Sequence, residues 1–447
     1  MIQKVLIANR GEIAVRIIRA CKAIGVETVA VYSTADEKAL HRVLADKAIC
    51  IGGPQPSESY LNIPSIIQAA LNEGVDAIHP GYGFLSESAK FVRACDDAGI
   101  TFIGPSAKVI EAMGDKAIAK QTMKKANVPL VPGSDVPLSL DDTFALAEKI
   151  KPPVLLKAVA GGGGKGMRRV DDLSTFKPNY LAAKSEAQAA FSNGDLYLEK
   201  YLINPRHIEV QILADQYGHT VHLGTRDCSA QRNHQKVIEE APAILPDGLE
   251  EKITAAAIKA AKAVNYVNAG TVEFLVTGDD FYFIEMNTRI QVEHPVTEMV
   301  TGIDLVAMQL WVASGEKLPF SQSDITFKGH AIEVRLNAEK PDDGFKPSPG
   351  PVGFVHFPGG PHVRVDSYLY SGSSVVPFYD SMMGKLIVHH HTRQEAIDTL
   401  QAALDELVID GIDHNQTFLK RLINSSTFNE GNYHTGFIPA FLARRAS

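Results

Sequence analysis

Two glutamates on opposite arms of a predicted hairpin have the spacing of a divalent-cation site. Runs of β-forming residues within 271–287 flank a turn centred on Asp279, which predicts an antiparallel hairpin with a three-residue loop. With Asp279 at the tip, Glu273 lies opposite Glu285, and Asn287 shares their face because strand side chains alternate. Facing carboxylates repel unless a cation lies between them, and hard oxygen ligands suit Mg²⁺. We therefore predict that Glu273, Glu285 and Asn287 hold Mg²⁺ or Mn²⁺, the alternative being glutamates that line the solvent face of an edge hairpin.

The segment after the hairpin is dense in polar side chains that could act on a substrate. It contains Arg289, Gln291, Glu293 and His294 within six residues. Because Mg²⁺ completes its shell with water and substrate phosphates, a nucleotide is the natural ligand beside the predicted metal. We interpret this stretch as a reaction site that adjoins a metal–nucleotide site.

A glycine run, AGGGGKGM at 160–167, predicts a loop that closes over phosphates. The G-x-G-x-x-G pattern of dinucleotide-binding folds occurs here, but it lies between two predicted strands, and no Ser or Thr follows Lys165 as a Walker A motif requires. Bare backbone amides can approach phosphates closely, and glycines allow a lid to open and close. Lys157, on the preceding strand, would add a cation. The alternative is a surface loop with Lys157 solvated, which the entropy cost of four glycines disfavours.

The order of apolar runs and helical patterns predicts the fold class. Residues 1–110 alternate the two, which is typical of a doubly wound parallel sheet. Ligands of such sheets bind at loops beyond the strand ends, and the bulkiest of these loops is 79–87. A helix at 107–126 and a Pro-rich hinge lead to the glycine loop. Residues 347–391 are rich in β-formers and 394–424 are helical, so the chain is of mixed α/β and α+β class.

Two further stretches have the chemistry of a nucleotide site. The backbone around 199–202 could bind adenine through main-chain hydrogen bonds. A predicted loop over 225–243 gathers polar and cationic side chains, which favours contact with an anion or a ribose. These side chains are Gln231, His234 and Lys236, with Arg226 and Arg232 beside them.

Composition excludes several classes of partner. The net charge is 44 − 52 = −8 without long like-charge blocks, which argues against nucleic acid and anionic membranes. The four cysteines are far apart, so neither a zinc site nor a disulfide framework is predicted. No apolar run reaches transmembrane length, and the N-terminus lacks the profile of a signal peptide. We expect a cytoplasmic protein.

Together these motifs resemble the ATP-grasp superfamily, and within it essentially the whole chain resembles biotin carboxylase, the component of acetyl-CoA carboxylase and related biotin-dependent carboxylases. The most specific matching stretches are QRNHQKVIEEAPA and EMNTRIQVEHPVTE, and others are IANRGEIAVRIIRA, HPGYGFLSE, KAVAGGGGKGMR and YDSMMGKLI. The resemblance implies an ATP-grasp fold with an N-terminal doubly wound domain, a mobile lid and a C-terminal β-rich domain. The expected ranges are 1–113 for the N-terminal domain, 114–130 for a connector helix and hinge, 131–203 for the lid, and 204–447 for the core and C-terminal domain.

The resemblance also implies roles for the matched positions. ATP would contact Lys116, Lys157, Gly163, Gly164, Gly166, Glu199, Lys200, Leu202, His207, Gln231, His234, Glu273 and Glu285. Bicarbonate would contact Lys236, Arg289, Gln291, Val292 and Glu293, and biotin would contact Tyr82, Gly83, Gln291 and Arg335. Glu293 would be the general base, Arg335 would stabilise the biotin enolate, and Lys236 and Arg289 would complete the catalytic set.

The implied substrates and partners follow from the family. ATP and Mg²⁺ would drive carboxylation of biotin through carboxyphosphate. No A/V-M-K-M biotin-attachment motif and no carboxyltransferase segment occurs in the sequence, so we expect a separate biotin carboxyl carrier protein and carboxyltransferase subunits, or a place in a longer enzyme. Members of the family commonly form homodimers. Acetyl-CoA carboxylase, and hence fatty-acid synthesis, is the expected setting, with a pyruvate or propionyl-CoA carboxylase as the alternative.

Two other functions compete with this interpretation. An ATP-grasp ligase that joins a carboxylate to an amine would share the lysines and metal ligands but would not need Arg289, Glu293 and Arg335 as a set. A nucleotide-binding regulatory module without catalysis would be expected to lack Glu293 or a metal ligand, and none is missing.

Overall fold

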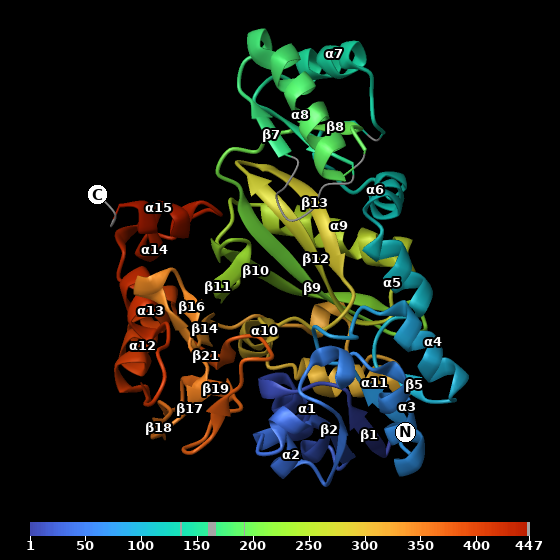
Figure 1. The fold of residues 1–447 in the computed structure, drawn as a ribbon, viewed down its shortest axis with the longest axis vertical. Helices are drawn as coiled ribbons and strands as arrows, with labels where there is room; N and C mark the ends of the chain where they lie inside the picture. The colour runs from blue at the N-terminus through green and yellow to red at the C-terminus, as the bar shows by residue number, and fades with distance from the viewer. Residues whose placement is uncertain (135, 160–166, 192, 445–447) are drawn as a thin grey trace.

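The computed structural model describes residues 1–134, 136–159, 167–191 and 193–444 (Figure 1). Its first unit is a five-stranded sheet in the order β3-β2-β1-β4-β5, with every neighbouring pair parallel. The order reverses between β1 and β4, so the loops after these two strands meet at the switch point where such sheets bind ligands. The predicted doubly wound domain is confirmed. Its elements are β1 (Lys4–Ile7), α1 (Gly11–Ala23), β2 (Glu27–Ser33), α2 (Leu40–Leu44), β3 (Lys47–Gly52), α3 (Ile63–Glu73), β4 (Ala77–His79), α4 (Ala89–Asp97) and β5 (Thr101–Phe102).

The connector after this sheet consists of two helices, so the single helix predicted over 107–126 is wrong. Helix α5 (Ala107–Gly114) ends at the glycine, and α6 (Lys116–Lys125) begins two residues later. Between them, the Asp115 carboxylate accepts hydrogen bonds from two amides in the first turn of α6, at 2.9 and 3.0 Å. An aspartate that satisfies free amides in this way starts a new helix.

A small unit extends away from the rest of the molecule, at the top of Figure 1. Its three strands are antiparallel in the order β7-β6-β8, and its helices share a separate hydrophobic core that includes Leu156 and Phe176. The strands before and after the glycine run confirm that the run does not join a strand to a helix. Gly163, Gly164 and Gly166 themselves lie outside the described residues. The elements are α7 (Leu140–Ile150), β6 (Val154–Ala158), β7 (Met167–Val170), α8 (Phe176–Phe191) and β8 (Leu196–Lys200).

One eight-stranded antiparallel sheet joins the middle of the chain to its C-terminal part. Its order is β13-β12-β9-β10-β11-β14-β21-β19. The β-rich C-terminal region is therefore continuous with the sheet that the central hairpin begins. The strands are β9 (Arg206–Ala214), β10 (Thr220–Arg232), β11 (Gln235–Ala241), β12 (Asn268–Thr277), β13 (Asp280–Asn287), β14 (His330–Asn337), β19 (Val363–Ser367) and β21 (Met382–His390).

The stretch predicted as a polar loop over 225–243 is a hairpin of this sheet. Strands β10 and β11 pair antiparallel and are joined at Asn233 and His234, both of which have positive φ. The loop prediction is wrong because the polar side chains of β10 are buried against other polar groups instead of facing water. Arg226 and Ser229, for example, are fully buried.

Helices cover the central sheet and close the C-terminal part. The alanine-rich face of α9 packs against the middle strands, with Ala257, Ala260 and Ala261 fully buried. Leu400 and Phe418 belong to the C-terminal core. The helices are α9 (Leu249–Ala263), α10 (His294–Thr301), α11 (Leu305–Ala313), α12 (Arg393–Glu406), α13 (Gln416–Ile423), α14 (Ser426–Asn429) and α15 (Phe437–Ala443). Short strands complete this part: β15 (Glu339–Lys340), β16 (Lys346–Pro347), β17 (Gly350–Pro351), β18 (Val355–His356), β20 (Ser374–Val375) and β22 (Val408–Ile409).

Among the described residues, no single helix has the length and apolar composition needed to cross a membrane, although α10 and α11, bent by 95°, meet the test if they are taken together. In α11, Leu305, Val306 and Leu310 pack into the hydrophobic core that adjoins the N-terminal sheet.

Candidate active site

The two glutamates of the central hairpin face each other, but the turn differs from the predicted one. Thr277 pairs with Asp280, so the loop has two residues and the predicted three-residue loop is wrong. A two-residue loop alone would place Glu273 opposite Ile284. Instead Ile284 has no partner on β12, and Glu273 pairs with Glu285. Ile284 is the extra residue of a β-bulge, and the bulge restores the facing carboxylates.

Glu273 is buried and fully engaged, whereas Glu285 is exposed. One oxygen of Glu273 accepts hydrogen bonds from Lys236 Nζ, Asn287 Nδ2 and Gln291 Nε2, each at 2.9 Å. Burial alone would raise the pKa of Glu273, but the surrounding cations, Lys236 first, hold this pKa well below its usual range. Partial desolvation and the charge of Glu273 raise the pKa of Glu285. The pair thus has an excess of negative charge on its exposed side.

This donor set fits a hard divalent cation. Two carboxylates and an amide oxygen are ligand types that Mg²⁺ accepts, and a cation would relieve the repulsion between Glu273 and Glu285. Asn287 Oδ1 now accepts a hydrogen bond from Arg289 Nη2 at 3.0 Å, so this oxygen would exchange the arginine for the metal. Ligand atoms of His207, Glu209 and Glu273 also lie within 4.8 Å of one another. A lysine ammonium group already bridges the two glutamates of that second set.

That ammonium group belongs to Lys236, which joins three buried carboxylates. Its Nζ donates to Glu209 at 2.6 Å, Glu273 at 2.9 Å and Glu293 at 2.5 Å. Burial disfavours a charged lysine, but the three carboxylates outweigh it and raise the pKa of Lys236 well above its usual value. Lys236 therefore stays charged and connects the predicted metal site to the predicted base.

Glu293 lies between two cations at the start of α10. Its second carboxylate oxygen accepts a hydrogen bond from Arg335 Nη2 at 2.9 Å, while Arg335 Nε donates to Glu239 at 2.6 Å. Burial would raise the pKa of Glu293, but Lys236, Arg335 and the more distant Arg226 lower it. Burial and the neighbouring Glu293 raise the pKa of Glu239 to about 7 against the lowering effect of Arg335. The structure brings the predicted base and the predicted enolate-stabilising arginine into direct contact.

Glu87, in the N-terminal domain, binds the loop between β13 and α10. Arg289 Nε donates to Glu87 Oε2 at 3.0 Å, and the other oxygen of Glu87 accepts the backbone amide of Thr288 at 3.0 Å. Glu87 ends the loop 79–87, which was predicted to project toward a substrate. That loop does reach the predicted bicarbonate residues.

Arg226 is fully buried beneath this loop and does not face a ligand. Its guanidinium donates to Glu209 at 2.5 Å and to Gln291 Oε1 at 2.6 Å. The side chain of Gln291 is thereby fixed with its amide nitrogen toward Glu273. Arg232 lies over the ring of Phe345 and forms an ion pair with Glu339 at 3.3 Å. Arg226 has no exposed surface, so it does not itself offer the predicted anion or ribose contact, whereas for Arg232, which is partly exposed, the contact stays a prediction.

Gln231 and His234, two further members of the 225–243 group, lie apart in the fold, and Gln231 contacts His207. His207 Nε2 lies 3.0 Å from Glu273, and its Nδ1 is 2.8 Å from Gln231 Nε2, so these two predicted nucleotide residues adjoin the metal ligands. Burial disfavours the charged form of His207, but Glu273 outweighs burial and raises the pKa of the imidazole. His234 is exposed at the tip of the hairpin, where no interaction among the described residues joins it to this group.

The predicted phosphate lysines lie where the connector meets the small unit. Lys157 on β6 forms an ion pair with Glu199 on β8, and the second oxygen of Glu199 accepts from Lys120 on α6. Burial would raise the pKa of Glu199, but Lys157 and Lys120 lower it. Lys116 is exposed one helical turn before Lys120, so both side chains project from the same face of α6.

The predicted adenine edge follows directly after Glu199. Lys200 is partly buried, and its Nζ donates to the backbone carbonyl of Lys151 at 2.7 Å. Leu202 is also partly buried, in the segment between β8 and β9. The edge strand and the connector helix therefore bound one region, which adjoins the paired lysines.

Tyr82 is held by the loop after β1. Asn9 Nδ2 donates to the carbonyls of Pro80 and Tyr82, both at 2.7 Å, and the Tyr82 hydroxyl donates to Glu12. Gly83 has φ of 69°, a conformation that favours glycine, and a Cβ there would meet nothing within 4 Å. The two loops at the switch point of the sheet thus fix the predicted biotin contacts.

Several buried residues of the site were missed from sequence. They are Glu12, Glu209, Glu239 and Lys385, all of which contact predicted site residues. Glu209 shares a strand face with His207 and could have been found from that spacing. Glu239 and Lys385 bear no such signal, because their neighbours come from distant parts of the chain.

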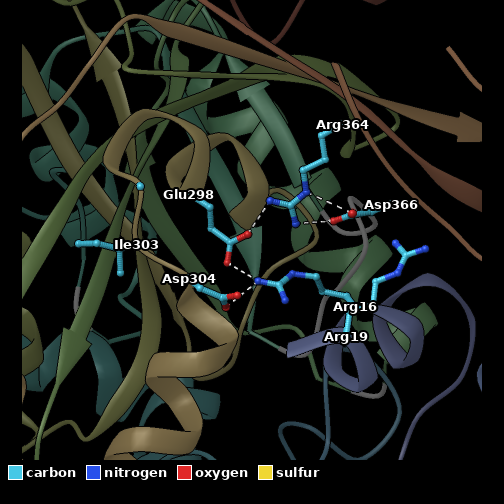
Figure 2. Close-up of a pocket in the computed structure, with 8 residues that line it drawn as sticks. Arg16, Arg19, Glu298, Ile303, Asp304, Arg364 and Asp366 are labelled. Carbon is cyan, nitrogen blue, oxygen red and sulfur yellow. Dashed lines mark hydrogen bonds and ion pairs between the residues drawn. The ribbon is translucent and has the colours of Figure 1, made fainter. Parts of the chain in front are cut away.

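The pocket in Figure 2 is separate from this cluster. It measures about 360 Å³ and lies between α1, the α10–α11 corner and β19. Arg16 and Arg364 both bind Glu298, at 2.7 and 2.8 Å, and Arg364 also binds Asp366. None of the predicted site residues lines it.

Comparisons with known proteins agree with the fold. Residues 1–110 match the biotin carboxylase N-terminal domain, 115–321 match the ATP-binding domain of the carbamoyl-phosphate synthase L chain, and 333–440 match the biotin carboxylase C-terminal domain. A biotin carboxylase of Nostoc sp. is 53% identical over 97% of this chain and 98% of its own length. The chain belongs to the biotin carboxylase family. It is therefore an ATP-dependent ligase of the ATP-grasp fold, as predicted.

Other similar proteins come from different parent enzymes. A pyruvate carboxylase subunit of Methanothermobacter thermautotrophicus is 51% identical over 99% of this chain and 90% of its own length. The biotin carboxylase domain dimer of 2-oxoglutarate carboxylase from Hydrogenobacter thermophilus, solved with MgADP, ADP and bicarbonate, is 48% identical with a TM-score of 0.89, and 98% of each chain is covered. The expected domain boundaries stay a prediction.

Proposed function

We propose that this chain carboxylates biotin on a separate carrier protein, with ATP and bicarbonate as substrates and Glu293 as the general base. The observation that carries the proposal is the position of Glu293, which has one carboxylate oxygen on Lys236 and the other on Arg335. A carboxylate–amine ligase has no evident use for this arrangement. A base placed between two cations suits a small anion that must lose a proton.

The electrostatics of the site support a base that is switched on by its substrate. Lys236 and Arg335 keep Glu293 ionised, but a carboxylate with a lowered pKa is a weak base. Bicarbonate bound between the same cations would take over part of their hydrogen bonds and would add its own negative charge. Both changes make Glu293 more basic, and the cations make bicarbonate more acidic because they stabilise carbonate.

In the first step, Glu293 takes the proton of bicarbonate, whose oxygen attacks the γ-phosphorus of ATP and releases ADP to give carboxyphosphate. Phosphoryl transfer depends mainly on positioning and on neutralising the charge of the phosphates. Lys116 and Lys157 would neutralise this charge once ATP displaces Glu199 from Lys157. Mg²⁺ bound to Glu273, Glu285 and Asn287 would supply further positive charge beside the phosphates.

In the second step, carboxyphosphate breaks down to CO₂ and phosphate, and the phosphate accepts the proton from N1 of biotin. Arg335 stabilises the resulting enolate, which attacks CO₂. Burial disfavours a charged Arg335, but Glu239 and Glu293 outweigh burial and raise its pKa, so it remains a cation throughout. Closure of the small unit over the nucleotide would protect carboxyphosphate from water.

We infer that the partners are a biotin carboxyl carrier protein and carboxyltransferase subunits, and that the chain forms a homodimer. Acetyl-CoA is the proposed final acceptor, as the resemblance to the biotin carboxylase component of acetyl-CoA carboxylase implies. The similar pyruvate carboxylase protein favours pyruvate as the alternative. The four free cysteines support a reducing compartment, and we propose the cytoplasm.

The test is ADP release by the purified chain with Mg-ATP, with and without bicarbonate and free biotin. We expect release that requires bicarbonate and increases with biotin. Release that ignores both but responds to an amine and another carboxylate would move the chain to the ligase class. Nucleotide binding without turnover under every condition would indicate a regulatory module.

A further inference from the structure

A buried lysine stands where three parts of the chain meet. Lys385, on β21, has an exposed fraction of 0%. Its Nζ donates to the backbone carbonyl of Val292 at 2.7 Å and lies 3.2 Å from Glu12 Oε1. Glu12 belongs to the N-terminal sheet domain, Val292 to the loop that carries Glu293, and Lys385 to the C-terminal strands. Nothing in the proposed chemistry uses this ammonium group directly.

Two other acids lie near Lys385, but neither forms an ion pair with it among the described contacts. Asp366 is its register partner on β19, but both oxygens of Asp366 bind Arg364, as Figure 2 shows. Glu333 shares the sheet face, and neither of its buried oxygens has a hydrogen-bond partner among the described residues. Burial, followed by Glu239 and Glu293, raises the pKa of Glu333 well above its usual value despite Lys385. Glu12 is the carboxylate in ion-pair contact with the buried lysine.

Glu12 carries the connection onward to the biotin side. The same oxygen, Oε1, that faces Lys385 also accepts the hydrogen bond from the Tyr82 hydroxyl. The other oxygen of Glu12 is buried without a partner among the described residues, so the carboxylate is held by these two donors. A displacement of Lys385 would therefore move Glu12 Oε1 and, with it, the hydrogen-bonded hydroxyl of Tyr82.

The opposite end of the connection lies at the bicarbonate side. Val292 precedes Glu293, and its peptide orientation fixes where the proposed base leaves the backbone. Lys385 is also the direct cross-strand partner of Arg335, so the two cations share a face of the sheet. Lys385 thus contacts the peptide before the proposed base and neighbours the proposed enolate-stabilising arginine.

We propose that Lys385 and Glu12 are positioning residues that set the distance between the biotin contact Tyr82 and the bicarbonate loop at Val292 and Glu293. The proposal rests on the proposed function, because it concerns how two substrates are brought together. Lys385 acts on both substrates, since it binds Val292 and Glu12. Glu12 contacts the biotin side directly, through Tyr82, and reaches the bicarbonate loop only through Lys385.

The two residues therefore predict different kinetic signatures. Glu12→Gln keeps the shape of the side chain but weakens its bonds to the Tyr82 hydroxyl and the ammonium group. We expect the KM for free biotin to rise about tenfold, the effect of losing one charge-assisted hydrogen bond, and the KM for bicarbonate to change less than about threefold. Lys385→Met removes the donor to Val292 and should raise both KM values about tenfold or more. Lys385→Arg, which keeps the charge, should recover part of the biotin effect.

A matched control comes from an equivalent pair elsewhere. Glu240 is a buried glutamate that also accepts from a tyrosine hydroxyl, that of Tyr433, and binds a cation, Arg393. Glu240→Gln should lower stability as Glu12→Gln does and leave both KM values unchanged. Thermal unfolding of each variant gives the folded fraction for correcting the rates.

The wild-type chain is measured first for bicarbonate-dependent ADP release and for fixation of labelled bicarbonate into biotin. Absence of both would reject the proposed function and would leave the positioning proposal without a basis. If both activities are present, equal changes of the two KM values in Glu12→Gln, or unchanged values in Lys385→Met, would overturn the proposal. If Lys385→Met does not fold, the Glu12→Gln split decides alone.

Discussion

Replacing Glu293 by glutamine is the sharpest test of the proposed base. Glutamine keeps the size and one oxygen acceptor of the side chain but cannot take a proton. The neighbouring cations keep other partners, since Lys236 still binds Glu209 and Glu273, and Arg335 still binds Glu239. The Glu293→Gln chain should therefore fold, with a cost of about 1–3 kcal/mol from the altered buried hydrogen bonds.

The expected loss of activity is much larger than this change in stability. A positioned general base contributes roughly 10²–10⁴-fold to a proton-transfer step, so kcat for bicarbonate-dependent ATP cleavage should fall by about that factor. The KM for bicarbonate should not rise, because removing an anion from between two cations favours anion binding. MgATP binding should change less than about twofold, since no nucleotide contact is altered.

The assay is ADP release over a range of pH, with Glu239→Gln as the matched control. Glu239 is also a buried carboxylate on Arg335, yet among the described contacts it has no hydrogen bond to Lys236. Glu239→Gln should keep most of the bicarbonate-dependent ATP cleavage and impair biotin carboxylation instead. In Glu293→Gln the rate should recover partly at alkaline pH, where bicarbonate in solution loses its proton without help. Equal losses in both variants, or a Glu293→Gln rate independent of pH, would refute the assignment of the base.

Three further predictions concern metal binding and stability. Glu285→Gln removes one of the two facing carboxylates, so the Mg²⁺ concentration for half-maximal activity at fixed ATP should rise at least about tenfold; an unchanged value would exclude Glu285 as a ligand. Arg226→Met leaves buried acceptors without their donor and should lower the free energy of unfolding in urea by about 3–5 kcal/mol, with an unchanged midpoint as the contrary result. Burial opposes ionisation of Glu240, but His330 and Arg393 lower its pKa from 4.5 to about 2, so it stabilises the fold by about 3 kcal/mol above pH 4.5 and loses this effect as pH falls toward 2. The stability difference between the wild type and Glu240→Gln should shrink over that range, and a constant difference would contradict the argument.

Patterns that depend on local spacing were predicted well. The N-terminal parallel sheet and the strands around the glycine run follow from short-range periodicity, which the sequence shows directly. The pairing of Glu273 with Glu285 was also predicted, although the turn was not. The expected pairing occurs because the shorter turn shifts the register of the two strands by one residue and the extra residue of the bulge shifts it back.

Features that depend on tertiary burial were not predictable in the same way. Strand β10 was interpreted as a loop because Arg226, Asp227 and Ser229 are typical surface residues. Their burial is stabilised by partners on β9 and on α10, which no local pattern reveals. Lys385 illustrates the same limit, because its contacts Glu12 and Val292 are far from it in sequence.

The bulge at Ile284 determines which residues of β13 face the hydrophobic core and which face the site. Phe283 packs into the core beside Phe274, while Glu285, two residues later, faces the site; a regular strand would put both on one side. The bulge shifts the alternation by one residue, so Phe283 and Glu285 lie on opposite faces although they are two positions apart. Deleting Ile284 would leave Phe283 and Glu285 as neighbours on opposite faces, so each would keep its face and only the local bend would be lost. The shortened hairpin would keep the same metal ligands but would change their orientation. Comparing its Mg²⁺ requirement with that of the wild type would therefore show how much the local bend contributes to metal binding.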